Sequence, residues 1–176
     1  MEKNKAGESR RLAYLLRHDR CYDFDVHGWR EVSELVANHG FTLDSLDEIV
    51  KNDEKMRYEY NADKSCVRAC QGHSVCVDVE LKEMRPPCEL FHGTAGRNAL
   101  SIMKYGIVKG KRLYVHLSES KDIAVVAGKR YGEPVVFKIY AKRMAEDGVE
   151  FYHSRNGVWL TEYVGAKYLE LMADIK

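Results

Sequence analysis

The sequence contains no long hydrophobic run: none of its apolar stretches approaches the roughly 20 residues that a helix needs to span a bilayer. Residues 1–11 are rich in charged side chains and lack the apolar core of a signal peptide. Internal repeats and low-complexity segments are also missing. These absences predict a folded protein of the cytoplasm that has no membrane partner.

The usual motifs of metal and dinucleotide sites are missing as well. Neither a G-x-G-x-x-G loop nor a G-x-x-x-x-G-K loop is present, which excludes a Rossmann-type dinucleotide site and a phosphate loop. The cysteines are odd in number and form no C-x-x-C pair. We therefore expect no metal centre, and reduced thiols in or near a core, from Cys21, Cys66, Cys70, Cys76 and Cys88.

The charge is nearly balanced, with a formal net value of +1 at pH 7, which argues against a general nucleic-acid coat. Its distribution is uneven. Residues 1–85 carry 14 basic and 17 acidic side chains, whereas residues 86–176 carry 14 and 10. A polyanion must therefore bind through local patches rather than through a global field.

A chain of 176 residues can form one ordinary domain or two small lobes. The segment Arg85-Pro86-Pro87 breaks regular structure, because two prolines restrict the backbone and remove donors. Helical spacing dominates before this break and strand-like runs dominate after it. The sequence predicts an α+β protein with an α-rich lobe at 1–85 and a β-rich lobe at 86–176.

The sequence of the first lobe predicts three short helices and a hairpin. Apolar side chains recur at helical spacing in three segments, and two short runs flank a polar turn at 61–64. This combination is typical of a winged helix, although a fold alone does not establish a function. The helical segments are 12–16 after a cap at Ser9, 29–36 ending before Gly40, and 43–50 after a cap at Thr42; the hairpin strands are 56–60 and 65–70.

The sequence of the second lobe predicts strands, with helices between some of them. One further strand, at 75–81, is expected between the lobes. The strands are expected at 89–92, 113–117, 134–140 and 158–161, and the helices at 98–105 and 120–130.

Basic residues stand out at two places in the first lobe. Arg17 and His18 come at the end of the first helix, where both can leave the core side together. Alternatively, they only complement the helix dipole. Arg68 lies within a hairpin strand, where it either joins an anion site or belongs to a solvated strand face.

The segment Gln71-Gly72-His73-Ser74 combines a glycine with polar neighbours. A glycine allows the backbone to approach a ligand closely, and serine and histidine offer donors that suit a phosphate. The alternative is an ordinary turn. We interpret the segment as part of an anion site.

Polar residues also end two strands of the second lobe. The segment Phe91-His92-Gly93-Thr94 can present an imidazole, a bare backbone and a hydroxyl to a nucleotide. His116 and Ser118 share one face of another strand. For each histidine, a satisfied half-buried residue is the alternative.

Taken together and in this order, the motifs resemble the RNA 2′-phosphotransferase family, called Tpt1 in eukaryotes and KptA in bacteria. The resemblance covers nearly the whole chain. Its motifs are Ser9-Arg10-Arg11-Leu12, Leu16-Arg17-His18, Gly28-Trp29, Arg68, Gln71-Gly72-His73-Ser74, His92-Gly93-Thr94, His116-Leu117-Ser118, Gly128-Lys129-Arg130-Tyr131-Gly132 and Asn156-Gly157-Val158-Trp159-Leu160-Thr161.

The resemblance implies a winged-helix lobe that binds the RNA 2′-phosphate and a lobe of ADP-ribosyltransferase fold that binds NAD. The family's catalytic set matches Arg17, His18, Arg68 and Arg130. The positions that match NAD-binding residues are His92, Gly93, Thr94, His116 and Ser118, and those expected at the substrate phosphate are Gln71, His73 and Ser74.

The implied reaction consumes NAD and needs no metal. The RNA 2′-phosphate, carried by a tRNA in the eukaryotic family, attacks C1″ of the nicotinamide ribose, expels nicotinamide and forms an ADP-ribosylated intermediate. Attack by the ribose 2″-oxygen then releases 2′-OH RNA and ADP-ribose 1″,2″-cyclic phosphate. The protein is expected to act as a monomer.

Two other functions stay open: an ADP-ribosyltransferase that stops after the first transfer, and a non-catalytic RNA-binding module. One departure from the family is visible after Arg17-His18. There the family often has a proline, whereas this chain has Asp19-Arg20-Cys21, which bears on how the helix ends.

Overall fold

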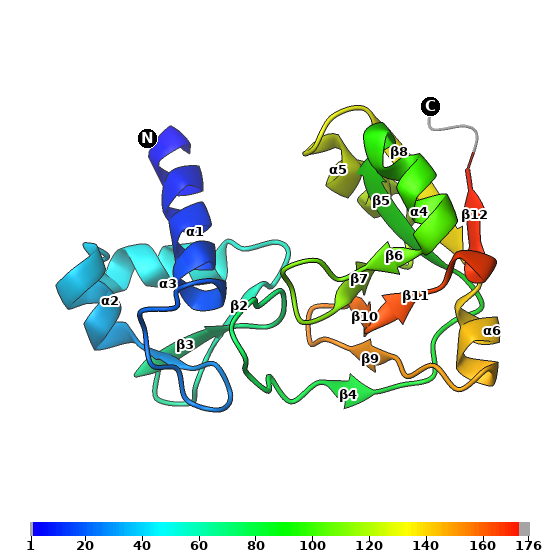
Figure 1. The fold of residues 1–176 in the computed structure, drawn as a ribbon. Helices are drawn as coiled ribbons and strands as arrows, with labels where there is room; N and C mark the ends of the chain where they lie inside the picture. The colour runs from blue at the N-terminus through cyan, green and yellow to red at the C-terminus, as the bar shows by residue number, and fades with distance from the viewer. Residues whose placement is uncertain (1, 173–176) are drawn as a thin grey trace. The chain divides into compact units, whose positions relative to one another are not determined.

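The computed structural model describes residues 2–172 (Figure 1). The chain divides into two compact units between Leu81 and Lys82, slightly before the break at 85/86 that the sequence predicts. Both units combine helices with antiparallel strands, which confirms the α+β class.

Unit 1 contains the helices α1 (Glu2–Arg17), α2 (Val32–His39) and α3 (Leu43–Lys51). Thr42 caps α3 as predicted: its side chain accepts from the backbone N–H of Ser45, and the Ser45 hydroxyl accepts in return from the backbone of Thr42. Gly40 follows α2 in the left-handed conformation at φ 65°.

Two predicted helix starts are wrong. Ser9 is not a cap, because α1 begins before it; instead the main-chain oxygen of Ser9 accepts a hydrogen bond from the Tyr58 hydroxyl at 2.9 Å. Helix α2 begins at Val32 rather than Trp29, since Arg30 and Glu31 form a short strand.

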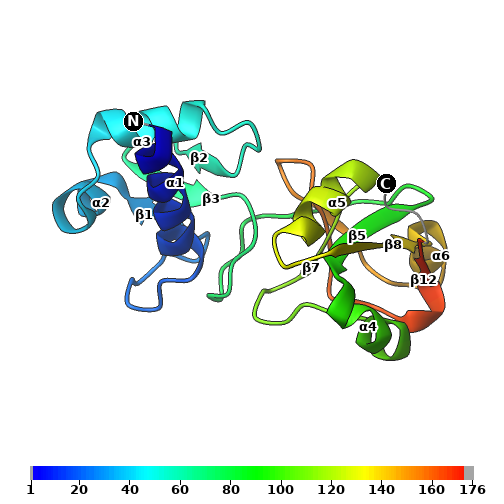
Figure 2. The ribbon, with the colours of Figure 1, turned by 90° about the horizontal axis from the view of Figure 1, so that it is seen from above.

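The sheet of unit 1 has the strand order β1-β3-β2, made from β1 (Arg30–Glu31), β2 (Tyr58–Tyr60) and β3 (Cys66–Ala69). The predicted hairpin is confirmed as β2 and β3, in a register that places Glu59 opposite Arg68. Helix α1 packs on both α3 and β3, as Figure 2 shows from above. The buried residues of this core are Leu12, Leu15, Leu16, Val32, Leu35, Phe41, Leu46, Tyr58, Val67 and Ala69.

The strand expected at 75–81 is wrong. The segment belongs to no sheet, and the backbone N–H of Asp78 donates to the oxygen of Val26 at 2.8 Å. Alternating apolar and polar residues can produce a strand pattern, but a strand also needs a partner edge along its length.

Unit 2 is built from short antiparallel strands in three small sheets. The predicted strands are confirmed in part as β5, β7, β8 and β10, and the remaining two- and three-residue strands were too short to show a pattern. The sheets have the orders β4-β9-β10-β7, β12-β8-β5 and β11-β6, with β4 (Lys82–Glu83), β5 (Leu90–Ala95), β6 (Ile107–Val108), β7 (Val115–Leu117), β8 (Pro134–Ile139), β9 (Tyr152–His153), β10 (Trp159–Thr161), β11 (Tyr163–Val164) and β12 (Leu169–Leu171).

The two helices predicted in unit 2 are present as α4 (Ala99–Tyr105) and α5 (Lys121–Lys129). The Ser120 side chain caps α5 by accepting from the backbone of Ile123. The other helical segments are η1 (Gly96–Asn98), α6 (Ala141–Glu146) and η2 (Ala166–Tyr168).

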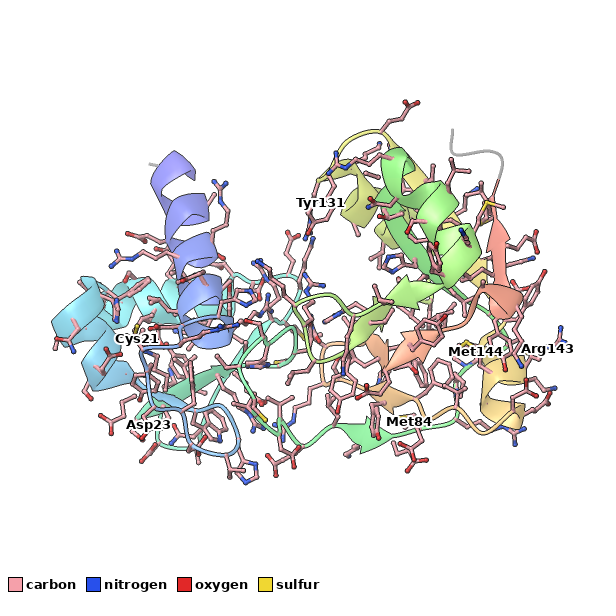
Figure 3. The ribbon with its side chains drawn as sticks, in the orientation of Figure 1. Cys21, Asp23, Met84, Tyr131, Arg143 and Met144 are labelled. Carbon is pink, nitrogen blue, oxygen red and sulfur yellow. The ribbon has the colours of Figure 1, made fainter. Side chains whose placement is uncertain are left out.

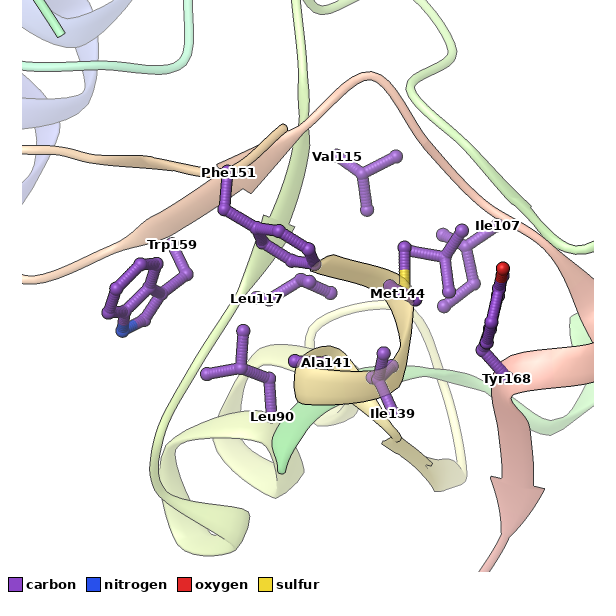
Figure 4. Close-up of a cluster of buried hydrophobic side chains, with 11 residues drawn as sticks. Leu90, Ile107, Val115, Leu117, Ile139, Ala141, Met144, Phe151, Trp159 and Tyr168 are labelled. Atoms are coloured by element: carbon purple, nitrogen blue, oxygen red, sulfur yellow. The ribbon is translucent and has the colours of Figure 1, made fainter. Parts of the chain in front are cut away.

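The core of unit 2 joins its three sheets and α6 (Figure 4). Leu90 and Ile139 come from one sheet, Leu117 from another, and Met144 from α6, and each is at most 2% exposed. Burial of these apolar side chains is the main force that holds so many short strands together.

The cysteines only partly follow the prediction. Cys70 is buried and Cys66 half-buried, whereas Cys21 (Figure 3), Cys76 and Cys88 are exposed, and all are free thiols. Within residues 2–172, no helix is long and apolar enough to cross a membrane, and no three His, Cys, Asp or Glu side chains are grouped to hold a metal ion.

Candidate functional site

The end of α1 is joined to the segment 71–74. The main-chain oxygen of Arg17 accepts from the N–H of Ser74 at 2.9 Å. The His18 ring nitrogen Nδ1 lies 3.0 Å from Ser74 Oγ. Backbone and side chain together therefore orient Arg17 and His18, and segment 71–74 does more than turn the chain.

Gly72 lies directly against Arg17. Its φ of +92° favours glycine, and a Cβ at this position would lie 3.5 Å from Cζ of Arg17. Gln71 precedes it and is half-buried. The sequence predicts that a ligand lies close to the backbone of Gly72. In the structure, the guanidinium of Arg17 lies there.

His73 is 2% exposed, and its Nε2 atom is buried without a hydrogen-bond partner among the described residues. Burial lowers the pKa of His73 to about 3, and the positive charges of Arg17, His18 and Arg68 add to this effect. The imidazole is therefore neutral at physiological pH, and it adds no charge beside Arg17, His18 and Arg68.

Arg68 is only 1% exposed, so the alternative of a solvated strand face is wrong. Its Nε donates to Glu59 Oε1 at 2.6 Å, and its Nη1 donates to the main-chain oxygen of His27 at 3.2 Å. Nη2 lies 3.1 Å from Oε2 of Glu80. Cζ stands 4.3 Å from the ring centroid of Trp29, a cation–π contact.

The loop before β1 places Trp29 on Arg68. The Asp25 carboxylate accepts from the backbone N–H groups of His27 at 3.0 Å and Trp29 at 2.8 Å. Gly28 takes a φ of +75°, and a Cβ there would approach Nε2 of His73 to 3.5 Å. Gly28-Trp29 therefore forms one wall beside His73 and Arg68.

Arg30 is a site-supporting residue that the sequence did not indicate. Its guanidinium is 1% exposed and donates through Nη1 to Asp19 Oδ2 at 2.8 Å. It also donates through Nε to Glu34 Oε2 at 2.7 Å, and its Cζ lies 4.1 Å from the ring centroid of Tyr22. Its contacts with Asp19 and Glu34 show this role only in the folded structure. In the sequence, a single arginine after a tryptophan matches no known motif.

Asp19 explains how the chain leaves α1 without a proline. Burial by itself would raise the pKa of Asp19, but hydrogen bonds from Arg30 and from the backbone of Cys21 hold it below its ordinary value. The carboxylate is therefore ionised, and it fixes the residues after Arg17-His18 by hydrogen bonds instead of by a pyrrolidine ring.

In unit 2, His92 lies on β5 and is connected to His116 on β7. The His92 Nδ1–H donates to the main-chain oxygen of His116 at 3.0 Å. Burial lowers the pKa of His92; this hydrogen bond acts in the opposite direction, and the charge of Arg112 lowers the pKa further. The neutral ring consequently presents Nε2 as an acceptor. The His116 Nδ1–H in turn donates to the oxygen of Tyr114 at 3.1 Å.

Gly93 is required by packing. A Cβ on Gly93 would lie 1.6 Å from the main-chain oxygen of Ala124, because α5 crosses β5 at this point. Beside it, Thr94 is 8% exposed, and its Oγ1 accepts from Asn98 Nδ2 at 2.9 Å. The sequence suggests that Gly93 leaves room for a nucleotide, but the packing of α5 against β5 already explains why this position has no side chain.

Ser118 and Arg130 complete the predicted residues of unit 2. Ser118 exchanges backbone hydrogen bonds with Phe91, and its Oγ accepts from the N–H of Ser120 at 3.1 Å, which brings it to the β5 edge. Arg130 follows the last residue of α5 and is exposed.

The predicted residues therefore form two groups, one in each unit. Unit 1 brings Arg17, His18 and Arg68 close enough to His73 to lower its pKa, and it places Ser74 against His18. Unit 2 gathers four polar residues and one glycine on and beside β5 and β7, namely His92, Gly93, Thr94, His116 and Ser118.

Comparison with known proteins identifies the class. The family described as RNA 2′-phosphotransferase, Tpt1 / KptA family, matches residues 3–163. A probable RNA 2′-phosphotransferase of Pseudomonas syringae pv. tomato is 42% identical over 99% of this chain and 98% of its own length. One from Acaryochloris marina is 39% identical over 96% and 97%, and one from Flavobacterium johnsoniae is 42% identical over 92% and 93%. The chain belongs to the Tpt1/KptA family of RNA 2′-phosphotransferases, and the resemblance read from its motifs is confirmed.

Proposed function

We propose that this chain removes an internal 2′-monophosphate from RNA, with a tRNA as the expected carrier, and consumes NAD in doing so. Membership of the family supports the reaction class. The observation that carries the proposal is the group of Arg17, His18 and Arg68 around a buried, neutral His73. Such a group suits a phosphate that must be held by charge and oriented by hydrogen bonds.

In this proposal unit 1 acts as a winged-helix lobe for the RNA 2′-phosphate, and unit 2 acts as an ADP-ribosyltransferase-like lobe for NAD. Three helices and a small antiparallel sheet, whose first strand lies between α1 and α2, support the first assignment. Short antiparallel strands with α5 packed on β5 support the second.

The residues of unit 2 fit NAD by their chemistry. His92 has a fixed tautomer and presents a neutral acceptor, and Thr94 and Ser118 add hydroxyl groups close to it in sequence or space. NAD would supply an electrophilic ribose carbon whose nicotinamide leaving group departs without needing an acid. The protein then only has to orient the reacting groups and exclude water.

Transfer of the phosphate away from the RNA concentrates negative charge on its oxygens. Arg17, Arg68 and Arg130 are proposed to stabilise that charge. His18 is proposed to donate a proton to the departing 2′-oxygen, in the ring orientation that Ser74 supports. The expected products are 2′-OH RNA, nicotinamide and ADP-ribose 1″,2″-cyclic phosphate.

The test incubates the purified protein, without added metal, with NAD and a short RNA carrying one internal 2′-phosphate. The same RNA without that phosphate is the control. Release of nicotinamide together with 2′-OH RNA, only from the phosphorylated RNA, is expected. An RNA that remains ADP-ribosylated would instead establish the arrested transferase, and binding without nicotinamide release would establish an RNA-binding module.

A further inference from the structure

The guanidinium of Arg68 has three oxygen partners: the Glu59 carboxylate, the main-chain oxygen of His27 and the Glu80 carboxylate. They differ in solvent exposure and in the structure that surrounds them. Glu59 lies opposite Arg68 in the β2–β3 register, at 2.6 Å from Nε, and its side chain is 18% exposed. The oxygen of His27 belongs to the main chain. Both are parts of the framework that keeps Arg68 in place.

Glu80 differs from these two partners. Its side chain is 52% exposed, and it lies in the irregular segment 75–81, outside any strand. Its backbone has a φ of +57°, which is unfavourable for a residue with a Cβ, and its N–H donates to Asp78 Oδ1 at 2.9 Å. The local turn thus aims a half-exposed carboxylate at Nη2 of Arg68.

A carboxylate and a phosphate bind a guanidinium through the same N–H groups and by the same charge. Since Nε and Nη1 are engaged by Glu59 and by the His27 oxygen, Nη2 is the position where an incoming anion can replace an existing partner. That existing partner is Glu80.

We propose that Glu80 is an affinity-determining residue that occupies the phosphate position on Arg68 until the RNA 2′-phosphate displaces it. This inference rests on the proposed function of Arg68 as a phosphate ligand. The apparent affinity for an anion at Arg68 equals the intrinsic affinity multiplied by the fraction of molecules in which Glu80 is displaced. A small anion that contacts only Arg68 binds weakly, because it must displace Glu80 without other contacts. An RNA makes further contacts with the protein, and these offset the free energy needed to displace Glu80.

The test compares the wild type with Glu80→Gln, which keeps the shape and removes the charge. Glu54→Gln is the matched control, because Glu54 is an exposed residue of the same unit with no contact to Arg68. We expect Glu80→Gln to lower the KM for 2′-phosphorylated RNA about threefold to tenfold, with kcat nearly unchanged. Inorganic phosphate should inhibit the variant at correspondingly lower concentration.

Glu59→Gln provides a contrast of opposite sign, because loss of a framework partner should raise KM or lower stability. If Glu80→Gln, Glu54→Gln and wild type have the same KM and the same inhibition by phosphate, the inference about Glu80 is overturned. Turnover of the phosphorylated RNA in the same experiment would still support the proposed function. If the wild type shows no turnover, the proposed function fails by itself. Stabilisation by added inorganic phosphate in thermal unfolding, stronger for Glu80→Gln than for wild type, then supports the inference, and equal stabilisation overturns it.

Discussion

Nη1 of Arg30 lies 2.8 Å from Oδ2 of Asp19, and the same nitrogen donates to the main-chain oxygen of Leu15 at 3.0 Å. One buried nitrogen atom therefore contacts the chain both before and after Arg17-His18. Ser74 holds the same dipeptide from its other side through the oxygen of Arg17 and the ring of His18. The two basic residues are therefore held by these contacts as well as by α1, which ends at Arg17 and accepts the His18 N–H at the oxygen of Tyr14, 2.8 Å away.

Asp19→Ala should therefore disturb the site as well as the fold. Removing one partner of the buried Arg30 is expected to cost about 1–3 kcal/mol of unfolding free energy, since Glu34 still pairs with it. Misplacement of Arg17 and His18 should lower kcat about tenfold, more than it changes KM. Denaturant unfolding and steady-state kinetics measure the two effects.

Asp23→Asn is the control for this change, because Asp23 is exposed (Figure 3) and lies in the same loop. It should leave both stability and kcat at the wild-type level. A stable Asp19→Ala protein with unchanged kcat would show that Arg30 does not position the dipeptide.

The depressed pKa of His73 makes stability depend on pH. The unfolded chain binds a proton at His73 below its ordinary pKa of 6.5, whereas the folded protein does so only near pH 3. Stability due to this neutral imidazole is thus fully present above about pH 6.5 and is lost as the pH falls towards 3. Between pH 7 and pH 5, His73 alone should remove about 2 kcal/mol.

His73→Asn removes this titration. Unfolding free energies of wild type and variant, measured at pH 7 and pH 5, should show a smaller decrease for the variant. Parallel pH profiles of the two proteins would mean that His73 ionises normally in the folded state.

Arg68→Lys keeps the positive charge but cannot keep the geometry. Lysine has no planar fork with which to reach Glu59, His27 and Glu80 at once, and it loses the stacking on Trp29. We expect a loss of release of 2′-OH RNA larger than the loss of nicotinamide release, together with about 1–3 kcal/mol of stability. Wild-type rates for both products in Arg68→Lys would show that charge alone suffices.

Gly93→Ala tests whether packing or ligand approach requires glycine. A Cβ only 1.6 Å from the oxygen of Ala124 forces α5 away from β5, which should destabilise the protein by about 3 kcal/mol or prevent folding. Gly7→Ala is the control, because Gly7 lies in α1 with open space around it and alanine favours helix. A Gly93→Ala protein of normal thermal stability would contradict the packing explanation.

Local signals in the sequence determined much of the architecture. Helical spacing and the Thr42 cap located α3, and the left-handed glycine after α2 marked its end. The hairpin followed from short runs around a polar turn. These features depend on hydrogen bonds within a few residues, so they are visible in the order of the residues. Where a strand depended on a distant partner, as at 75–81 or in the two-residue strands, the same signals failed.

The order of the motifs also sufficed to indicate the family. Only the tertiary structure decided the physical state of the residues in those motifs. Burial made His73 neutral, enclosed Arg68 between Glu59 and Glu80, and placed Arg30 against Asp19. Desolvation and long-range charge pairing depend on which distant segments meet, and nothing in the local sequence around a single arginine or histidine records that.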